Sequence, residues 1–179
     1  METKVITRED VKRSIRDIVD FPKKGIVFKD LTTAFKDAAV LNYMLDEIAG
    51  YYQGKGITKV VGVESRGFIL GTALALRLNA GFVPVRKPGK LPAETFIEEY
   101  TLEYGTDIIE IHQDALSEND IVLIHDDLLA TGGTLNAVLN LVNRFNVRNK
   151  FVNFAVELEF LKGREKFPYD LDVFSLVKF

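Results

Sequence analysis

Two kinds of hydrophobic pattern alternate along the chain. Short continuous apolar runs predict buried strands at 59–63, 81–85, 121–125, 150–158 and 172–177. Before and between these runs, apolar residues recur every three or four positions and predict helices at about 7–19, 37–52, 67–78 and 134–145. Continuous apolar strands joined by helices are typical of a parallel sheet covered on both faces. The sequence therefore predicts an α/β fold with a mostly parallel central sheet flanked by helices.

Local signals refine three of these helices. Thr7-Arg-Glu-Asp10 has the form of a capping box, and apolar residues then follow at helical spacing at positions 11, 15, 18 and 19. Asp37 is a candidate N-cap for the second helix. The helix over 67–78 is apolar on nearly every side, which predicts that it is buried.

One segment departs from the alternation of strands and helices. Residues 96–102 and 107–111 are both β-like and are separated by Glu103-Tyr-Gly105, which predicts a β hairpin or flap over 94–111. The chain has no internal repeat, low-complexity tract or evident linker. We therefore expect one domain over 1–179, with residues 1–35 as a hood over the edge of the sheet.

Composition narrows the class of protein. The chain has 47% hydrophobic and 27% charged residues, as in ordinary soluble proteins, and its net charge of -3 argues against a nucleic-acid partner. It has no cysteine, which excludes disulfides, thiol nucleophiles and cysteine metal sites. No apolar run is long enough for a membrane span, and the first 20 residues lack a signal-peptide core. We expect a cytoplasmic protein with no membrane partner.

The stretch from Val122 to Thr134 combines two acids with a loop of small residues. Asp126 and Asp127 follow an apolar strand, and open parallel sheets bind ligands beyond the carboxyl ends of their strands. Adjacent side chains of an extended strand point in opposite directions, so both acids reach one ligand only if the chain turns there. The loop 130–134 offers backbone N–H groups, two hydroxyls and the start of a helix, which suits a phosphate. The stretch predicts a site for a phosphorylated sugar.

Basic residues follow two other predicted strands. Arg66 lies between small residues after the strand 59–63, where a guanidinium can clamp a diphosphate. Arg86, Lys87 and Lys90 follow the strand 81–85 and add positive charge. The flap is acidic instead, with carboxylates at positions 94, 98, 99, 103, 107 and 110. An acidic flap can supply a general base or exclude water when it closes, and the pattern alone does not choose among the acids.

Other nucleotide and catalytic motifs fit less well. The glycines of Gly62–Gly67 have the spacing of a P-loop, but Phe68 and Ile69 stand where that motif requires Lys and Ser or Thr. No Gly-x-Gly-x-x-Gly follows a strand. Val63-Glu-Ser-Arg-Gly67 differs by one residue from the nucleophile elbow of serine hydrolases, which would need His112 or His125 as its base. Neither histidine has a supporting motif around it.

Several segments together resemble the type I phosphoribosyltransferases. Ile124-His-Asp-Asp-Leu-Leu-Ala-Thr-Gly-Gly-Thr134 is similar to their motif for phosphoribosyl pyrophosphate (PRPP), in the form carried by the members that act on adenine. The further matching segments lie at 21–30, 64–68, 102–105, 109–115 and 157–164. The resemblance extends over essentially the whole chain.

The resemblance implies that adenine and PRPP react to give AMP and pyrophosphate, with Mg²⁺ carried by PRPP rather than bound directly by the protein. It assigns the ribose hydroxyls to Asp126 and Asp127, and the 5′-phosphate to Ala130, Thr131, Gly132, Gly133 and Thr134. It assigns the pyrophosphate to Glu64, Ser65, Arg66, Arg86 and Lys90. Members of the family often have a non-proline cis peptide in this region, which here would join Glu64 and Ser65.

The same resemblance implies where the base binds and which groups take part in catalysis. Adenine is assigned to Val27, Phe28, Lys29, Leu128 and Leu129, with the backbone reading the base edge and Phe28 enclosing the ring with one of the leucines. Glu103 and Tyr104 match the flap tip, where Glu103 is the implied proton acceptor beside the catalytic Arg66. A homodimer is also implied.

The sequence departs from the family pattern at three positions and leaves two alternatives. Lys29 stands where arginine is common, Thr33 where proline is common, and His125 where the family has an apolar residue. The same fold can act on another 6-substituted purine, such as hypoxanthine or xanthine, although the adenine-type hood argues against this. A regulator that senses PRPP without catalysis usually adds a DNA-binding module or a basic surface, and neither is evident.

Overall fold

The computed structural model describes residues 5–102 and 105–179 of the chain. Its helices are α1 (Arg8–Ser14), α2 (Thr32–Phe35), α3 (Ala38–Tyr52), α4 (Gly67–Arg77) and α5 (Gly133–Asn143). Its strands are β1 (Arg16–Val19), β2 (Val27–Asp30), β3 (Lys59–Val63), β4 (Gly81–Val85), β5 (Thr95–Leu102), β6 (Gly105–His112), β7 (Ile121–Leu129), β8 (Asn149–Glu157) and β9 (Asp172–Lys178). Two 3₁₀ turns, η1 (Glu159–Leu161) and η2 (Gly163–Lys166), lie between β8 and β9.

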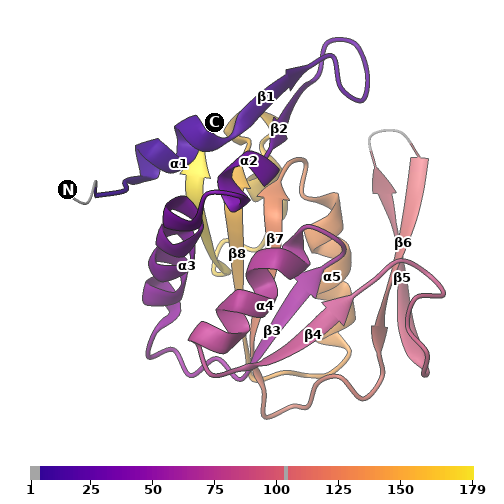
Figure 1. Ribbon diagram of the computed structural model, residues 1–179. Coiled ribbons are helices and arrows are strands. Elements are labelled where there is room, and N and C mark those ends of the chain that lie inside the picture. Colours follow the sequence, from indigo (N-terminus) through magenta and orange to yellow (C-terminus); the bar gives the residue numbers. More distant parts are fainter. Residues whose placement is uncertain (1–4, 103–104) are drawn as a thin grey trace.

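The central sheet is parallel, as the continuous apolar strands predict. Its five strands lie in the order β4-β3-β7-β8-β9, with α3 and α4 on one face and α5 on the other (Figure 1). Alternate strand residues supply two separate cores: Val60 and Leu123 pack on the α3/α4 side, whereas Val61 and Ile124 pack with α5. Because both faces are buried, the strands can be apolar at every position. The predicted fold class is confirmed.

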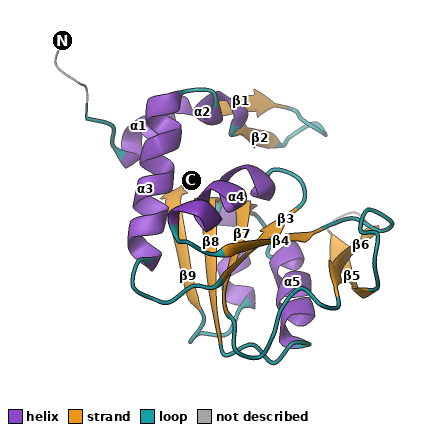
Figure 2. Ribbon diagram, turned by 60° about the horizontal axis from the view of Figure 1, so that its bottom comes forward, coloured by secondary structure: helices purple, strands orange, loops and turns teal. Residues whose placement is uncertain are grey.

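The N-terminal segment folds differently from the long helix predicted for it. The capping box is present, with the Thr7 side chain accepting from the backbone N–H of Asp10, but α1 ends at Ser14. Ile18 and Val19 belong instead to β1, which pairs with β2 in an antiparallel hairpin. That part of the helix prediction was wrong, because apolar residues at helical spacing can also arise by chance at a helix–strand junction. The hairpin lies over the carboxyl ends of the central strands (Figures 1 and 2).

The predicted flap is a two-stranded antiparallel hairpin of β5 and β6. Its base is fastened to the body of the protein: Phe96 packs edge-on against Phe145, with ring centroids 5.4 Å apart, and Arg144 forms an ion pair with Glu98 at 3.1 Å. A backbone bridge between Arg86 and Glu110 ties β6 to the end of β4. The hairpin therefore stands at the side of the central sheet (Figure 1).

Helix α3 matches its prediction, whereas α4 is less buried than predicted. The Asp37 side chain caps α3 by accepting from the backbone N–H groups of Ala39 and Val40. In α4, Ile69 and Leu76 are 48% and 79% exposed, so an apolar face of this helix points to solvent. Within residues 5–102 and 105–179, no helix has both the length and the apolar character of a transmembrane segment.

Candidate active site

The carboxyl ends of β3 and β7 open into a cavity of about 420 Å³. Its wall is made by the end of β3 and the turn into α4, by the end of β7 and the loop into α5, and by the flap. The lining residues are Val63, Glu64, Ser65, Arg66, Lys87, Tyr100, Ile109, Asp126, Asp127, Leu128, Ala130 and Thr134. Parallel strands bring their carboxyl ends to one edge, which is why segments distant in the sequence meet here.

Both acids of the PRPP-like motif face this cavity, although the chain does not make the turn on which this was expected to depend. Strand β7 continues through Asp126 and Asp127 to Leu129, so the prediction that the strand ends at His125 was wrong. The Asp126 side chain bends along the strand, and its Oδ1 accepts from the backbone N–H of Asp127 at 2.8 Å. Asp127 Oδ2 forms an ion pair with Arg66 Nε at 2.7 Å. The Nε–H bond does not point at this oxygen, so the contact is not a hydrogen bond. The two carboxylates thus converge on the β3–α4 turn.

The environment of these acids disfavours their charged forms. Burial, followed by the charge of Asp127, raises the pKa of Asp126 well above its ordinary value. Burial also raises the pKa of Asp127, although the Arg66 guanidinium opposes this. A ligand that brings hydroxyl donors or positive charge would stabilise two negative charges at this site. Among the residues that the structure describes, no group of three or more His, Cys, Asp or Glu side chains could hold a metal ion.

Arg66 links the hood to the acids. It is the N-cap residue of α4, and its guanidinium lies 5.0 Å from the centre of the Phe28 ring on β2. The predicted cis peptide between Glu64 and Ser65 is present. Gly67 follows, and a Cβ atom there would come within 3.0 Å of Asp126 Oδ1, so the turn into α4 lies directly against the acids.

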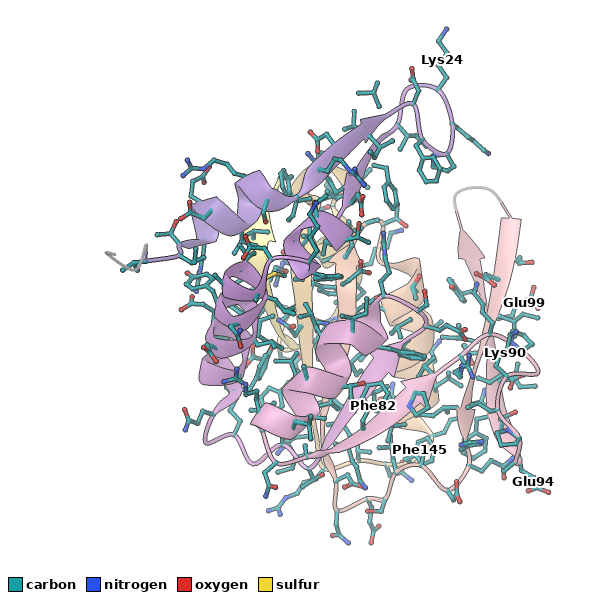
Figure 3. The ribbon with its side chains drawn as sticks, in the orientation of Figure 1. Lys24, Phe82, Lys90, Glu94, Glu99 and Phe145 are labelled. Carbon is teal, nitrogen blue, oxygen red and sulfur yellow. The ribbon has the colours of Figure 1, made fainter. Side chains whose placement is uncertain are left out.

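The other predicted basic residues do not all reach the cavity. Arg86 donates to Glu64 through Nε at 3.1 Å and Nη2 at 3.0 Å. This contact lowers the pKa of Glu64, although burial opposes the shift. Lys90 is exposed and lies beside the flap (Figure 3). Lys87 was predicted only to add positive charge near the site. It is the basic residue of this loop that lines the cavity.

Lys87 belongs to a polar network on the flap that the sequence did not identify. Its Nζ forms an ion pair with Asp107 on β6, and the Tyr100 hydroxyl lies 3.3 Å from the same carboxylate. Despite opposing burial, the hydrogen bond from Lys87 lowers the pKa of Asp107. Burial raises the pKa of Tyr100, although the Thr134 side chain opposes the shift. Only the cross-strand register, which pairs Tyr100 with Asp107, could have suggested this cluster.

The small-residue loop has the backbone form that its glycines allow. Gly132 has a φ of 82°, in the left-handed region, and is the N-cap residue of α5. Ala130 and Thr134 line the cavity, with Thr131, Gly132 and Gly133 between them. The first turn of α5 therefore starts at the cavity wall, where its free N–H groups favour an anion.

The predicted base-binding residues are only partly brought together. Lys29 points away from the acids, because its Nζ bonds Asp17 at 2.6 Å and lies 4.0 Å from the centre of the Phe179 ring. Leu128 lines the cavity, whereas Leu129 is 2% exposed in the α5-side core. This corrects the prediction for Leu129: alternate residues of a strand face opposite sides, so only one leucine can face the ligand. Glu103 and Tyr104 lie outside the described residues.

The serine hydrolase alternative finds no support in the described residues. His125 is fully buried, and its Nδ1 lies 2.7 Å from Asn153 Oδ1 on β8. Ser65 lines the cavity and shares no hydrogen bond with either histidine in the described part of the chain. His125 is thus a locally hydrogen-bonded residue of the strand.

His125 is expected to make stability depend on pH. Burial lowers its pKa from 6.5 to about 4, although the hydrogen bond to Asn153 opposes the shift. The unfolded chain therefore takes up a proton at a higher pH than the folded protein does. The stabilisation from neutral His125 is complete above pH 6.5. The free energy of unfolding then falls by about 3 kcal/mol as the pH drops from 6.5 to about 4.

The measurement is urea unfolding between pH 7 and pH 4 for the wild type and for His125→Leu. The leucine variant should lose this part of the pH slope, and the carboxylates common to both proteins cancel in the comparison. Parallel slopes for the wild type and His125→Leu would contradict the expectation.

The chain is similar to known proteins along nearly all of its length. A family model described as "Phosphoribosyl transferase domain" matches residues 32–177. The "Adenine phosphoribosyltransferase" of Bacteroides fragilis is 55% identical over 169 residues, which are 94% of this chain and 95% of that protein. The crystal structure of adenine phosphoribosyltransferase from Thermoanaerobacter pseudethanolicus is 51% identical, with a TM-score of 0.92 over 97% of this chain and 100% of that one. A 42% identical structure from Giardia lamblia, complexed with 9-deazaadenine, has a TM-score of 0.93 over 98% and 99% of the two chains.

Proposed function

The chain belongs to the phosphoribosyltransferase family, and we propose from that premise that it transfers the phosphoribosyl group of PRPP to adenine, giving AMP and pyrophosphate. This is the function of an adenine phosphoribosyltransferase in purine salvage. The observation that carries the proposal is the convergence of Asp126, Asp127, Arg66 and the 130–134 loop on one cavity, in a chain whose relatives carry that name.

Each group around the cavity receives one part of the donor. Asp126 and Asp127 accept hydrogen bonds from the ribose hydroxyls, and their charge favours the positive charge that develops on the ribose ring as the bond to pyrophosphate breaks. The loop 130–134 and the start of α5 hold the 5′-phosphate. Arg66 and the 64–65 peptide face the pyrophosphate.

The positive charge for the leaving group has a second candidate source. Lys87 lines the cavity, whereas Arg86 is paired with Glu64 and Lys90 is exposed. We therefore assign the pyrophosphate to Glu64, Ser65 and Arg66 as predicted, with Lys87 added. Arg86 then acts by fixing Glu64, and Lys90 supplies longer-range attraction for an anionic ligand.

Mg²⁺ fits this site as a companion of PRPP rather than as an ion caged by the protein. Asp126 and Asp127 offer carboxylate oxygens, the type of ligand that Mg²⁺ prefers, but the described residues supply no third acid close to them. These two residues would contact the hydrated ion. When bound, Mg²⁺ neutralises part of the charge that develops on pyrophosphate.

The base is recognised by the backbone of the hood. The Lys29 side chain contacts Asp17 and Phe179, so it does not reach the base. The backbone of Val27–Lys29 is therefore the part of this segment that can read the base edge, even though lysine replaces the common arginine. Phe28 and Leu128 enclose the ring. The hood segment 27–29 lies before the part matched by the family model, so support for adenine comes from the full-length relatives.

Further features of the family are proposed on the same basis. The exposed Ile69 and Leu76 of α4 support a homodimer. Light scattering would measure the mass of the protein in solution and so test this. We treat residues 1–35 as the hood and 94–111 as the flap of one domain over 1–179. A cytoplasmic location stays a prediction of the sequence.

The test incubates the purified protein with PRPP, Mg²⁺ and one base at a time: adenine, hypoxanthine, guanine or xanthine. Mass spectrometry then identifies the nucleotide formed. AMP from adenine alone is the expected result, and reactions without PRPP or without Mg²⁺ are the controls. If hypoxanthine or xanthine gives a nucleotide and adenine does not, the enzyme acts on another purine. If no base gives a nucleotide, the protein is not a phosphoribosyltransferase of purines.

A further inference from the structure

The loop assigned to the 5′-phosphate rests on a second loop that comes from the far end of the chain. A Cβ atom on Gly163 would overlap the carbonyl oxygen of Ala130 and would lie 3.1 Å from the backbone nitrogen of Gly132. A Cβ atom on Gly132 would lie 2.8 Å from the carbonyl oxygen of Gly163 and 2.8 Å from the Phe167 ring. The two backbones therefore touch, and neither position has room for a side chain.

Arg164, the next residue, fastens this second loop to two strands. Its Nε and Nη2 donate to the two carboxylate oxygens of Glu157 on β8, at 2.9 Å and 2.5 Å. Its Nη1 donates to the carbonyl oxygen of Val173 at 2.7 Å, and Nη2 also reaches Ser175 Oγ at 3.1 Å. A bidentate pair between planar groups fixes orientation as well as distance.

The buried partner makes this attachment hard to release. Glu157 is 4% exposed, so withdrawal of the guanidinium would leave a carboxylate that water barely reaches. On the other side of Gly163, Lys162 has a φ of 53° and ends η1, which reverses the chain just before the contact. Gly163 is thus held between a tight turn and a clamped arginine.

The phosphate loop needs such a support. Gly132 has left-handed backbone geometry, and glycine loops lose more conformational freedom on ordering than other segments do. An anion site made of backbone N–H groups binds well only if those groups are already aimed at the ligand. Gly163 touches the loop at Ala130 and Gly132, the two positions that set its course from β7 into α5.

We propose that Gly163 and Arg164 are positioning residues for the 5′-phosphate of the donor. Arg164 fixes the position of Gly163, and the contact with Gly163 fixes the position of the Ala130–Gly132 backbone. Neither residue lines the cavity, so both act through the loop. The inference deepens the proposed function and rests on its assignment of 130–134 to the 5′-phosphate.

The primary test is Gly163→Ala, with affinities for AMP, adenosine and adenine measured by calorimetry. The added methyl group forces the Ala130 carbonyl to shift, so the Kd for AMP should rise about ten-fold, and the KM for PRPP should rise with it. Affinities for adenosine and adenine, which lack the phosphate, should stay unchanged. Arg164→Lys keeps the charge but loses the bidentate fork, and should weaken AMP binding in the same selective way.

Two variants serve as controls. Gly50→Ala adds a methyl group where no atom lies within 4 Å, so every affinity should stay at the wild-type value. Ile48→Val removes a methyl group from the α3-side core, so it should lower the Tm without changing the preference for AMP over adenosine.

The outcomes separate this inference from the proposed function. A folded Gly163→Ala protein that binds AMP like the wild type, or that loses AMP and adenine equally, overturns the positioning role. If Gly163→Ala does not fold, Arg164→Lys decides by the same comparison of ligands. A wild type that binds AMP no better than adenosine overturns the phosphate-loop assignment and this inference with it. A wild type that prefers AMP, with variants that do the same, overturns the inference alone.

Discussion

Replacing Asp127 by asparagine is expected to lower kcat/KM for PRPP by about 10²–10⁴-fold, because two hydrogen bonds to a charged carboxylate contribute roughly 1.5–3 kcal/mol each. Asp127 is 4% exposed and pairs with Arg66 at 2.7 Å, so the change also releases the guanidinium proposed to face the pyrophosphate. Steady-state kinetics with PRPP varied at saturating adenine measures the effect. The loss should fall on PRPP, while the affinity for adenine alone should be retained.

Asp120→Asn is the matched control. Asp120 is also nearly buried on the chain leading into β7, but it lies at the opposite end of the strand and accepts from Thr58 and Ser117. It should lose stability without losing kcat/KM. If Asp127→Asn retained the wild-type kcat/KM for PRPP, the ribose-binding role of this carboxylate would be refuted.

Replacing Glu103 by glutamine is expected to lower kcat by about 10²–10⁴-fold, the usual contribution of a general acid or base. Glutamine keeps the size of the side chain but cannot take up the proton that adenine loses. The KM for PRPP should change little, since donor binding is assigned to other residues.

Glu99→Gln tests whether any lost charge on the flap has the same effect. Glu99 lies on β5 and is exposed, and it stands on the outer side of the flap in Figure 3. This variant should turn over like the wild type. Unchanged turnover in Glu103→Gln would remove the base role from Glu103.

The central sheet and its helices were predictable because their signals are local. The apolar runs at 59–63 and 81–85 coincide with β3 and β4, and α3 begins after Asp37 as its cap predicts. Burial on both faces forces continuous apolar strands, so the sequence of such a strand reports its position in the fold. The order of the strands is not local, and only the folded chain places β7 between β3 and β8.

The hood and the end of β7 were not predictable in the same way. Strands β1 and β2 have four residues each, pair only with each other within the described residues and contain no buried residue, so no buried pattern marks them. Ion pairs across the hairpin, such as Arg16–Asp30 at 2.5 Å, contribute to it instead. Strand β7 runs on through its two acids because β8 continues beside it, pairing Leu128 with Val156.

The sequence by itself determined the fold class, the acid and glycine motif, and the family to which they belong. The reason is that motif chemistry is carried by residues adjacent in the chain, and buried strands and helices have periods that can be counted. Only the tertiary structure decided which groups share the cavity: Lys87 rather than Arg86 on its wall, Leu128 rather than Leu129, and Gly163 beneath the phosphate loop. These choices depend on side-chain direction and on contacts between distant segments, and neither is recorded in local spacing.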